Sequence, residues 1–349
     1  MRKVLVDLNR LRENPYNGLY QFSKDLGQGL AAITDKELEL DFYLPSNKFG
    51  FFGNNVNYVP HYSRDKYYMR GTGKYDVWHI TTQISWYRPF NNRTKSVFTI
   101  HDLNFLIEEK DNVKRNKRLL ADIQKRVDRS HYITAISNYA LQVVEQHLDL
   151  HDLPRRVVYN GCAMESFPLF NAPKYKPSKP FLFSIGSVQP RKNFHALMPL
   201  LLNNDYELII AGQNHFDYAA TVQAAAEKYN VANRVKMIGA VSDEEKYWYY
   251  NNCMAFVFPS IAEGFGFPAI EAMILGKPVF LSVEACLPEI GGDAAYYFKH
   301  FDDSHMQQVF KEGMHHYETT KPQEHIKQRA ALFSWHNTAR DYMDIYKQV

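Results

Sequence analysis

Residues 256–280 read FVFPSIAEGFGFPAIEAMILGKPVF, and this stretch decides the fold. The apolar run 255–258 predicts a buried strand, and the glycine-rich segment 263–267 predicts a turn. A proline then favours the start of a short helix over 269–275, and a glycine followed by a second proline ends it. The next apolar run, 279–281, begins another strand. This order of strand, loop, helix and strand is typical of a parallel α/β sheet.

Two carboxylates flank the turn with seven residues between them, Glu263 in the loop and Glu271 on the expected helix. Ligands of parallel sheets bind where strand ends meet helix starts. Glu263 could therefore accept hydrogen bonds from a polyol, and Glu271 could hold a vicinal diol such as a ribose. The backbone N–H groups beside them suit an anionic group; they belong to Gly264, Phe265, Gly266 and Phe267. The alternative is an ordinary turn with a capping carboxylate and one surface glutamate.

The wider string 263–280, EGFGFPAIEAMILGKPVF, resembles the Glu-x7-Glu signature of the retaining glycosyltransferases of family 4. The resemblance covers nearly all of residues 180–340 and is patchier over 1–170. It implies an α/β chain of the GT-B fold, in which two Rossmann-like domains with parallel sheets face a central cleft. The expected parts are an N-terminal acceptor-binding domain at 1–170, a linker at 171–180, a nucleotide-sugar-binding domain at 181–325, and a helix at 326–349 that crosses back to the N-terminal domain.

Bulk composition narrows the class of protein. A chain of 349 residues predicts roughly two domains, and a net charge of +3 is too small to indicate a nucleic-acid binder by itself. Three cysteines, Cys162, Cys253 and Cys286, are odd in number and far apart, which argues against a disulfide framework or a zinc site and for a reducing compartment. Neither a signal peptide nor a membrane-spanning run is recognisable, so a cytoplasmic protein is expected.

The first strand-to-helix loop is a candidate phosphate contact. A strand is expected over 4–8 and a helix over 19–32, with the loop 14–18 between them. Gly18 would let backbone N–H groups approach a phosphate, although an ordinary turn uses the same residue. In family 4 this loop carries two adjacent glycines and faces the donor phosphate and the acceptor. Asn17 stands here where the family has its other glycine.

A His-Asp pair follows the strand expected over 97–100. His101 and Asp102 then lie at the carboxyl edge of the sheet. A lone histidine at such a position is often structural. The resemblance implies that His101 corresponds to the central histidine of the family, which approaches the transferred sugar, and that Asp102 orients the loop.

The segment 108–129 predicts a strongly charged helix. Its cations are Lys114, Arg115, Lys117, Arg118, Lys125, Arg126 and Arg129. A solvated helix face accounts for such a run. The alternative is a basic patch that contacts anionic lipid at the inner membrane face or a phosphorylated acceptor.

The second half opens with the layout of a phosphate site. A strand over 181–185 is followed by Gly186, by the cations Arg191 and Lys192, and by a helix expected to run to about residue 202. Arg191 could bind a diphosphate in a forked geometry, and Lys192 would supply a point charge. An exposed basic turn is the alternative. Walker A and GxGxxG patterns are absent from the sequence, so ATP and NAD are poorly supported.

The resemblance also implies a nucleotide-base pocket after the strand 235–238. The backbone there belongs to Ile238, Gly239, Ala240 and Val241. Backbone contacts of this kind do not separate guanine from uracil.

The function implied is retaining transfer of a hexosyl group, mannose favoured, from a GDP- or UDP-sugar to a glycan or lipid-linked acceptor of surface polysaccharide. Glu263 would hold the sugar hydroxyls, and Arg191 and Lys192 would neutralise the leaving diphosphate. The sequence has no Asp-x-Asp motif, so neither a catalytic metal nor a cofactor is expected. A non-catalytic nucleotide-sugar-binding subunit and a GT-B epimerase are the alternatives.

Overall fold

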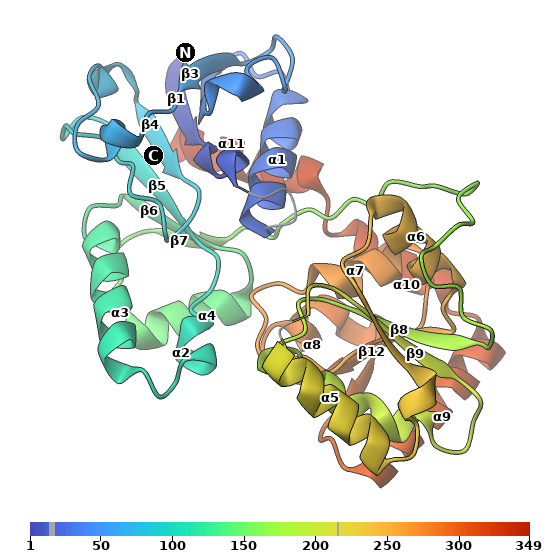
Figure 1. Ribbon diagram of the computed structural model, residues 1–349. Helices are drawn as coiled ribbons and strands as arrows, with labels where there is room; N and C mark the ends of the chain where they lie inside the picture. Colours follow the sequence, from blue (N-terminus) through green and yellow to red (C-terminus); the bar gives the residue numbers. More distant parts are fainter. Residues whose placement is uncertain (14–17, 215) are drawn as a thin grey trace. The chain divides into compact units, whose positions relative to one another are not determined.

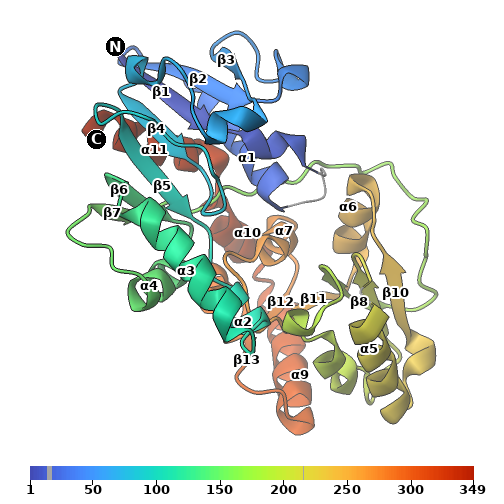
Figure 2. The same ribbon diagram turned by 60° about the vertical axis from the view of Figure 1, so that its left-hand side comes forward.

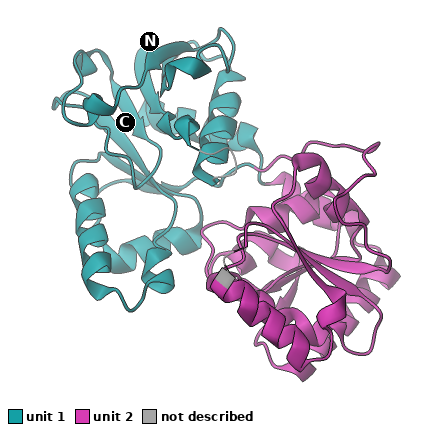
Figure 3. Cartoon of the chain, viewed as in Figure 1, with its two compact units in different colours: residues 1–161, 333–349 teal, residues 162–332 magenta. Residues whose placement is uncertain are grey.

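The chain folds into two compact units in the computed structural model, which describes residues 1–13, 18–214 and 216–349 (Figure 3). Unit 1 comprises residues 1–161 and 333–349, and unit 2 comprises residues 162–332. The expected phosphate loop at 14–17 lies outside the described residues.

Unit 1 is built on a seven-stranded parallel sheet with the order β3-β2-β1-β4-β5-β6-β7 (Figure 1). Its strands are β1 (Arg2–Asp7), β2 (Leu38–Leu44), β3 (Asn57–Pro60), β4 (Val77–Ile80), β5 (Lys95–Ile100), β6 (Tyr132–Ala135) and β7 (Arg155–Val157). Its helices are α1 (Gly18–Ala31), α2 (Phe105–Glu108), α3 (Val113–Val127), α4 (Asn138–His147) and α11 (Trp335–Gln348). Short 3₁₀ helices are η1 (Asn9–Arg12), η2 (Ser46–Lys48), η3 (Ser63–Lys66) and η4 (Thr72–Lys74).

Both faces of this sheet are covered, because successive side chains of a strand point to opposite faces. Val4 and Val6 of β1 belong to one buried cluster with residues of α1 and α11. Leu5, between them, belongs to a second cluster that includes Ile123 and Val127 of α3. A strand that is apolar on both faces is the pattern of a sheet sandwiched between helices.

The single helix expected over 326–349 is two helices: α10 belongs to unit 2, and only residues 333–349, which contain α11, belong to unit 1 (Figure 3). Helix α11 packs beside α1 (Figures 1 and 2). Tyr342 and Tyr346 are fully buried in the cluster formed with α1. The Tyr346 hydroxyl lies 2.6 Å from Nδ1 of His79 in β4, and Arg156 forms an ion pair of 2.5 Å with Asp341. These contacts join α11 to the central strand β4 and to the edge strand β7.

Unit 2 contains a six-stranded parallel sheet with the order β10-β9-β8-β11-β12-β13. Its strands are β8 (Phe181–Ile185), β9 (Glu207–Ala211), β10 (Val235–Gly239), β11 (Ala255–Phe258), β12 (Val279–Ser282) and β13 (Tyr296–Phe298). Its α-helices are α5 (Phe216–Lys228), α6 (Asp243–Asn252), α7 (Phe267–Ile274), α8 (Leu287–Gly291), α9 (Asp303–Thr320) and α10 (Gln323–Ala331). The 3₁₀ helices are η5 (Pro190–Lys192), η6 (Phe194–Leu201), η7 (Ala232–Arg234) and η8 (Gly292–Ala294).

The boundary between the units differs from the expected one, because unit 1 ends at residue 161 and the segment 162–180 belongs to unit 2. The predicted linker 171–180 is hydrogen-bonded to that unit. The Glu207 carboxylate accepts hydrogen bonds from the backbone N–H groups of Ser178 and Lys179, at 2.9 and 3.2 Å. The Tyr249 hydroxyl donates to the carbonyl of Tyr175 at 2.6 Å. Proline content alone did not reveal this docking.

The basic helix expected over 108–129 is two helices, α2 and α3, separated by a turn. Asn112 caps α3, since its side chain accepts a hydrogen bond from the N–H of Arg115 at 3.3 Å. Among the described residues, no helix has both the length and the hydropathy to cross a bilayer.

Candidate active site

The central strands of unit 2, β8 and β11, end beside each other, and two loops meet at that edge of the sheet. Gly186 directly follows β8, and the loop continues to Arg191 and Lys192 in η5. The loop after β11 contains Ser260 and Glu263. The backbone joins the two loops, because the N–H of Ile261 donates to the carbonyl of Arg191 at 2.8 Å.

The two predicted cations and the first predicted carboxylate are in direct contact. Lys192 Nζ lies 2.5 Å from Oε1 of Glu263, and Arg191 Nη1 lies 3.2 Å from the same oxygen. The Ser260 hydroxyl also donates to this oxygen at 2.6 Å. Lys192 and Glu263 are buried, so their charges interact in a medium of low dielectric constant. In the chain without ligand, the carboxylate thus positions both cations.

The surroundings of Glu263 and Lys192 shift the pKa values of both groups. Burial disfavours an ionised Glu263, but Lys192 and Arg191 outweigh that effect and hold the pKa of its carboxyl below the usual range. Burial and the charge of Arg191 lower the pKa of Lys192, and Glu263 opposes them. One carboxylate against two cations leaves a net positive group, which suits an anion.

Two glycines allow the loops to approach this closely. A Cβ atom on Gly186, which has φ of 151°, would lie 2.9 Å from Cε of Lys192. A Cβ atom on Gly212 would lie 2.0 Å from the carbonyl oxygen of Gly186. No real side chain tolerates the second distance, so Gly212 is required by the backbone contact. The sequence predicts Gly186 as part of a phosphate site but gives no comparable signal for Gly212.

The helix expected after Arg191 and Lys192 is not an α-helix. The chain forms two 3₁₀ helices, η5 and η6, separated at Asn193, which has φ of 54°. Pro199 lies inside η6 and cannot donate a backbone hydrogen bond, which disfavours a continuous α-helix. The positive charge near β8 therefore comes from two side chains rather than from the start of a long helix.

The second predicted carboxylate, Glu271, lies within α7 and has its own partners. Lys246 of α6 forms an ion pair with it at 2.9 Å, and the Tyr250 hydroxyl donates to its other oxygen at 2.9 Å. Burial opposes the charge of Lys246, but the nearby Glu271 raises the pKa of its ammonium group overall. Neither Lys246 nor Tyr250 was predicted from the sequence, although both lie one and two turns along a helix whose start was recognised.

Contacts within the turn between Glu263 and Glu271 stabilise its conformation. Phe265 is buried and its ring lies 5.1 Å from that of Phe267. Gly266, with φ of 92°, is the residue before α7, and its carbonyl accepts a hydrogen bond from the N–H of Ala269 at 3.0 Å. Together with Gly264, these residues form the loop from which the chain enters α7.

The expected base-binding backbone lies at the end of β10. Ile238 and Gly239 are its last two residues, and Ala240 and Val241 follow before α6. The carbonyl of Gly239 accepts a hydrogen bond from the N–H of Gly212 at 2.8 Å, which joins this segment to the neighbouring loop. Lys174 of the docked segment donates to the carbonyl of Ala240.

The remaining two predicted residues are in unit 1. Gly18 is the first residue of α1. His101 follows β5 and is buried, with its ring 4.5 Å from that of Phe22 in an edge-on arrangement. Its Nε2 lies 2.8 Å from the carbonyl oxygen of Thr81. A carbonyl only accepts, so Nε2 carries the hydrogen and Nδ1 is left as an acceptor.

Burial lowers the pKa of His101 to about 4, and the positive charge of Arg10 acts in the same direction. We therefore expect His101 to stay neutral at pH 5.5, with its hydrogen on Nε2. Protonation favours the unfolded chain, in which the group titrates near 6.5, so the contribution of His101 to stability falls as the pH drops from about 6.5 to about 4. Two-dimensional ¹⁵N spectra of the imidazole rings test this, with His101→Asn to assign the signals. An imidazolium signal from His101 at pH 6 would contradict the prediction.

Two family models match the chain: Glycosyl transferases group 1 over residues 168–331 and Glycosyltransferase Family 4 over residues 31–166. The chain belongs to glycosyltransferase family 4. The cluster of Arg191, Lys192 and Glu263 lies within the first of these regions, and His101 lies within the second.

Curated relatives of this family 4 glycosyltransferase include bacterial mannosyltransferases. The serotype-specific mannosyltransferase WbdA of Escherichia coli is 28% identical over 236 residues, which are 62% of this chain and 29% of WbdA. The chain thus aligns to less than a third of that relative. The O-antigen chain mannosyltransferase B of Escherichia coli is 26% identical over 275 residues, which are 72% of this chain and 70% of the relative.

Solved structures show the fold. A sucrose-phosphate synthase from Thermosynechococcus elongatus superposes with a TM-score of 0.75 at 17% identity, covering 100% of this chain and 99% of that one. Anabaena Alr3699/HepE, solved in complex with UDP-glucose, superposes with a TM-score of 0.70 at 15% identity and covers 100% of both chains. The predicted α/β class and GT-B fold are confirmed.

The family 4 glycosyltransferase also has polar residues at the sheet edge of unit 1 that sequence reasoning missed. Asp7, the last residue of β1, is buried and accepts hydrogen bonds from the Ser85 hydroxyl at 2.6 Å and from the Asn9 side chain at 2.5 Å. Burial raises the pKa of its carboxyl. Arg10 donates to the carbonyl of Ile84 at 3.0 Å. The position of Asp7 at the end of an apolar strand is the sequence feature that could have identified it as a candidate site residue.

Proposed function

We propose that this family 4 glycosyltransferase transfers a hexosyl group, mannose favoured, from a nucleotide sugar to a glycan or lipid-linked acceptor, with retention of configuration. The product would enter surface polysaccharide or lipopolysaccharide. The observation that carries the proposal is the convergence of Lys192 and Arg191 on Glu263, at the carboxyl edge of the sheet in unit 2.

This cluster supplies what departure of a nucleoside diphosphate requires. Negative charge develops on the leaving diphosphate, and Arg191 and Lys192 would stabilise it from a site already held by the protein. The Glu263 carboxylate is ionised and would accept hydrogen bonds from sugar hydroxyls. Because Ser260 also donates to Glu263, the carboxylate keeps its position when the cations turn toward a diphosphate.

His101 would contribute a neutral hydrogen-bond acceptor. Its Nδ1 atom carries a lone pair, since Nε2–H donates to Thr81. A neutral acceptor suits a sugar hydroxyl and adds no charge beside the reacting bond. Proton transfer by an imidazolium is not part of the proposal, because burial lowers the pKa of His101 to about 4.

The sugar and the acceptor are proposed from the relatives. WbdA is named a serotype-specific mannosyltransferase and two other relatives are named O-antigen chain mannosyltransferases, whereas one superposed structure contains UDP-glucose. Mannose is therefore favoured, and the base is left to experiment. The exposed cations of α3, which are Lys114, Arg115, Lys117, Arg118 and Lys125, are compatible with a solvated face or with contact at an anionic membrane.

Thermal shift with a nucleotide panel tests the donor site. The panel comprises GDP, UDP, CMP and dTDP, with ADP and NAD as controls. A ligand at about 100 times its dissociation constant adds roughly 2.7 kcal/mol to stability, so a selective rise with GDP or UDP is expected. The matching sugar nucleotide is then incubated with and without acceptor glycans. Product formed without an acceptor would support an epimerase, and a rise without product under either condition would support a non-catalytic nucleotide-sugar-binding subunit. No rise with any diphosphate would contradict the proposed donor site.

Glu271→Gln is expected to weaken binding of the preferred diphosphate by about 10–100-fold, because a charged hydrogen bond to the ribose is lost. Titration calorimetry measures the effect, and Glu318→Gln on the exposed face of α9 is the control. The 2′-deoxy analogue distinguishes a ribose contact from general damage. Wild type should prefer the ribose form, and the variant should lose that preference. An unchanged preference would remove Glu271 from the proposed site.

A further inference from the structure

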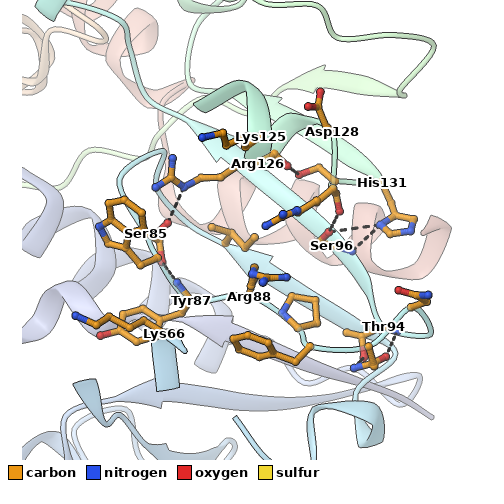
Figure 4. A pocket seen from close by; sticks show the side chains of 18 of the residues that line it. Lys66, Ser85, Tyr87, Arg88, Thr94, Ser96, Lys125, Arg126, Asp128 and His131 are labelled. Carbon is orange, nitrogen blue, oxygen red and sulfur yellow. Dashed lines mark hydrogen bonds between the residues drawn. The ribbon is translucent and has the colours of Figure 1, made fainter. Parts of the chain in front are cut away.

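Unit 1 contains a cavity of about 790 Å³ between the β4–β5 connection and helix α3 (Figure 4). It extends from Ser85, a few residues beyond the carboxyl end of β4, to Ser96 and His131 at the amino ends of β5 and β6. Its volume lies within the range of small-molecule sites, which is roughly 300–1,000 Å³. None of the residues predicted for the donor or for catalysis lines it.

The lining of the cavity is strongly basic. Five lysine and arginine residues line it against two aspartates, Asp122 and Asp128. Asp122 lies 3.6 Å from Lys125, which also lines the cavity, and its charge acts on Arg126. Asp128 accepts a hydrogen bond from Gln124 at 2.7 Å, and the charge of Arg129 acts on it. Within the described ranges, no ion pair involves Arg88, Arg126 or Arg129. The cavity therefore holds more positive charge than its own carboxylates offset.

Arg88 and Arg129 line the same cavity, and their positive charges act on each other. Burial lowers the pKa of the Arg88 guanidinium, and the charge of Arg129 adds to this effect. Arg88 lies over the ring of Phe90, with 4.7 Å between the guanidinium carbon and the ring centre. Figure 4 shows its side chain in the middle of the cavity. An anion between the two guanidinium groups would remove their repulsion and receive forked hydrogen bonds.

An aromatic ring lies open beside these cations. The side chain of Trp86 is 61% exposed, which is unusual for so large a ring in a residue that lines a cavity. Arg126 holds one face of it, with its guanidinium carbon 4.8 Å from the ring centre, and donates to the carbonyl of Ser85 at 2.9 Å. Arg126, which is hydrogen-bonded to the backbone of Ser85, thus holds the Trp86 ring in position.

The polar groups on the opposite wall are neutral. Thr94 donates to the carbonyl of Tyr75 at 2.8 Å, and the Asn91 amide donates to Thr94 and Thr72. Burial lowers the pKa of His131, which keeps this imidazole uncharged near neutral pH. A ligand that matches this cavity combines an anionic group with a ring and hydroxyl groups.

We propose that this cavity binds a phosphorylated saccharide, with the phosphate between Arg88 and Arg129 and a sugar ring against Trp86. Guanidinium pairs suit phosphate, and open tryptophan rings suit the apolar face of a sugar. The site is separate from the proposed donor site, whose diphosphate and ribose contacts belong to unit 2. It does not depend on the proposed reaction and would exist in a chain that only binds sugars.

Titration calorimetry with glucose 1-phosphate, glucose and inorganic phosphate tests the proposal. Glucose 1-phosphate is expected to bind most tightly. The double variant Arg88→Gln, Arg129→Gln should weaken its binding by about tenfold or more, and Arg118→Gln on an exposed face of α3 should not change it. Trp86→Ala should reduce the affinity for glucose 1-phosphate more than that for inorganic phosphate. Arg88→Lys keeps the charge without the fork and should have an intermediate effect.

The variant Arg191→Gln distinguishes binding of glucose 1-phosphate in this cavity from binding at the proposed donor site. If glucose 1-phosphate bound only there, its binding would be lost in Arg191→Gln and retained in the Arg88, Arg129 double variant, and the proposal would be overturned. Binding to phosphatidylglycerol vesicles tests whether the phosphate that the cavity recognises belongs to a lipid headgroup. Binding of these vesicles through Arg88 and Arg129, without binding of glucose 1-phosphate, would also overturn the proposal. Thermal unfolding of each variant confirms that it is folded at the temperature of the titration.

Discussion

Replacing Lys192 with alanine is expected to lower the turnover number of the enzyme by about 10²–10³. The estimate follows from the loss of one charged donor at the position where negative charge develops during departure of the diphosphate. Binding of the substrate should change less than turnover, because the diphosphate is more negative in the transition state than in the bound donor. Steady-state kinetics with the preferred nucleotide sugar measure both quantities. Turnover within threefold of wild type would exclude Lys192 from catalysis.

The same change has a structural effect that needs its own control. Lys192 is buried against Glu263, and removing one partner of a buried ion pair costs about 3–5 kcal/mol, because the other charge stays behind. The double variant Lys192→Met, Glu263→Gln removes both charges and should recover much of that stability without recovering turnover. Lys311→Ala, on exposed α9, is the matched surface control. Recovery of turnover in the double variant would show that the loss in Lys192→Ala came from instability.

Ending the chain after Leu332 is expected to abolish folding of unit 1. Such a truncation deletes α11, whose buried side chains complete the cluster formed by α1 and β1. The exposed core would bind dyes specific for apolar surface and make the protein aggregate. Limited proteolysis should then cut unit 1 and leave unit 2 protected. A truncated chain in which unit 1 resists proteolysis as in wild type would contradict this expectation.

Single substitutions give a graded form of the same test. Tyr342→Ala and Tyr346→Ala should each destabilise unit 1 by about 3–5 kcal/mol, the range for deleting a large buried aromatic side chain. Tyr346→Phe removes only the hydroxyl that contacts His79 and should cost less. Arg340→Ala, on the exposed side of α11, should stay within about 0.5 kcal/mol of wild type. Urea unfolding of the whole chain measures these differences.

Local pattern and resemblance predicted the fold because each central strand has a clear signature. The apolar runs at β1, β5, β8 and β11 are buried on both faces, and Pro180 and Gly186 bound β8 while Pro259 follows β11. The edge strands β3 and β13 have weaker patterns and were not predicted. Docking of 162–180 depends on Glu207 and Tyr249, which are distant in sequence, so proline content suggested a free linker instead.

The contact between the two cations and Glu263 in the candidate site could be predicted from the order of the strands. Arg191 and Lys192 follow a strand, and Glu263 follows the neighbouring strand, so parallel topology alone places them at one edge. The partners of Glu271 could not be predicted in this way, because Lys246 comes from a different helix and only packing brings it to 2.9 Å. The protonation state of His101 likewise depends on burial and on Thr81, which the sequence does not reveal.

The position of α11 has a consequence for synthesis on the ribosome. Residues 1–161 emerge first, but the helix that seals their apolar face is translated only after all of residues 162–332. While residues 162–332 are being translated, the apolar surface of α1 and β1 that α11 later covers stays exposed on the nascent chain. Molecular chaperones that hold apolar segments are therefore expected to associate with the nascent chain over this interval, and to leave once residues 333–349 have passed the exit tunnel.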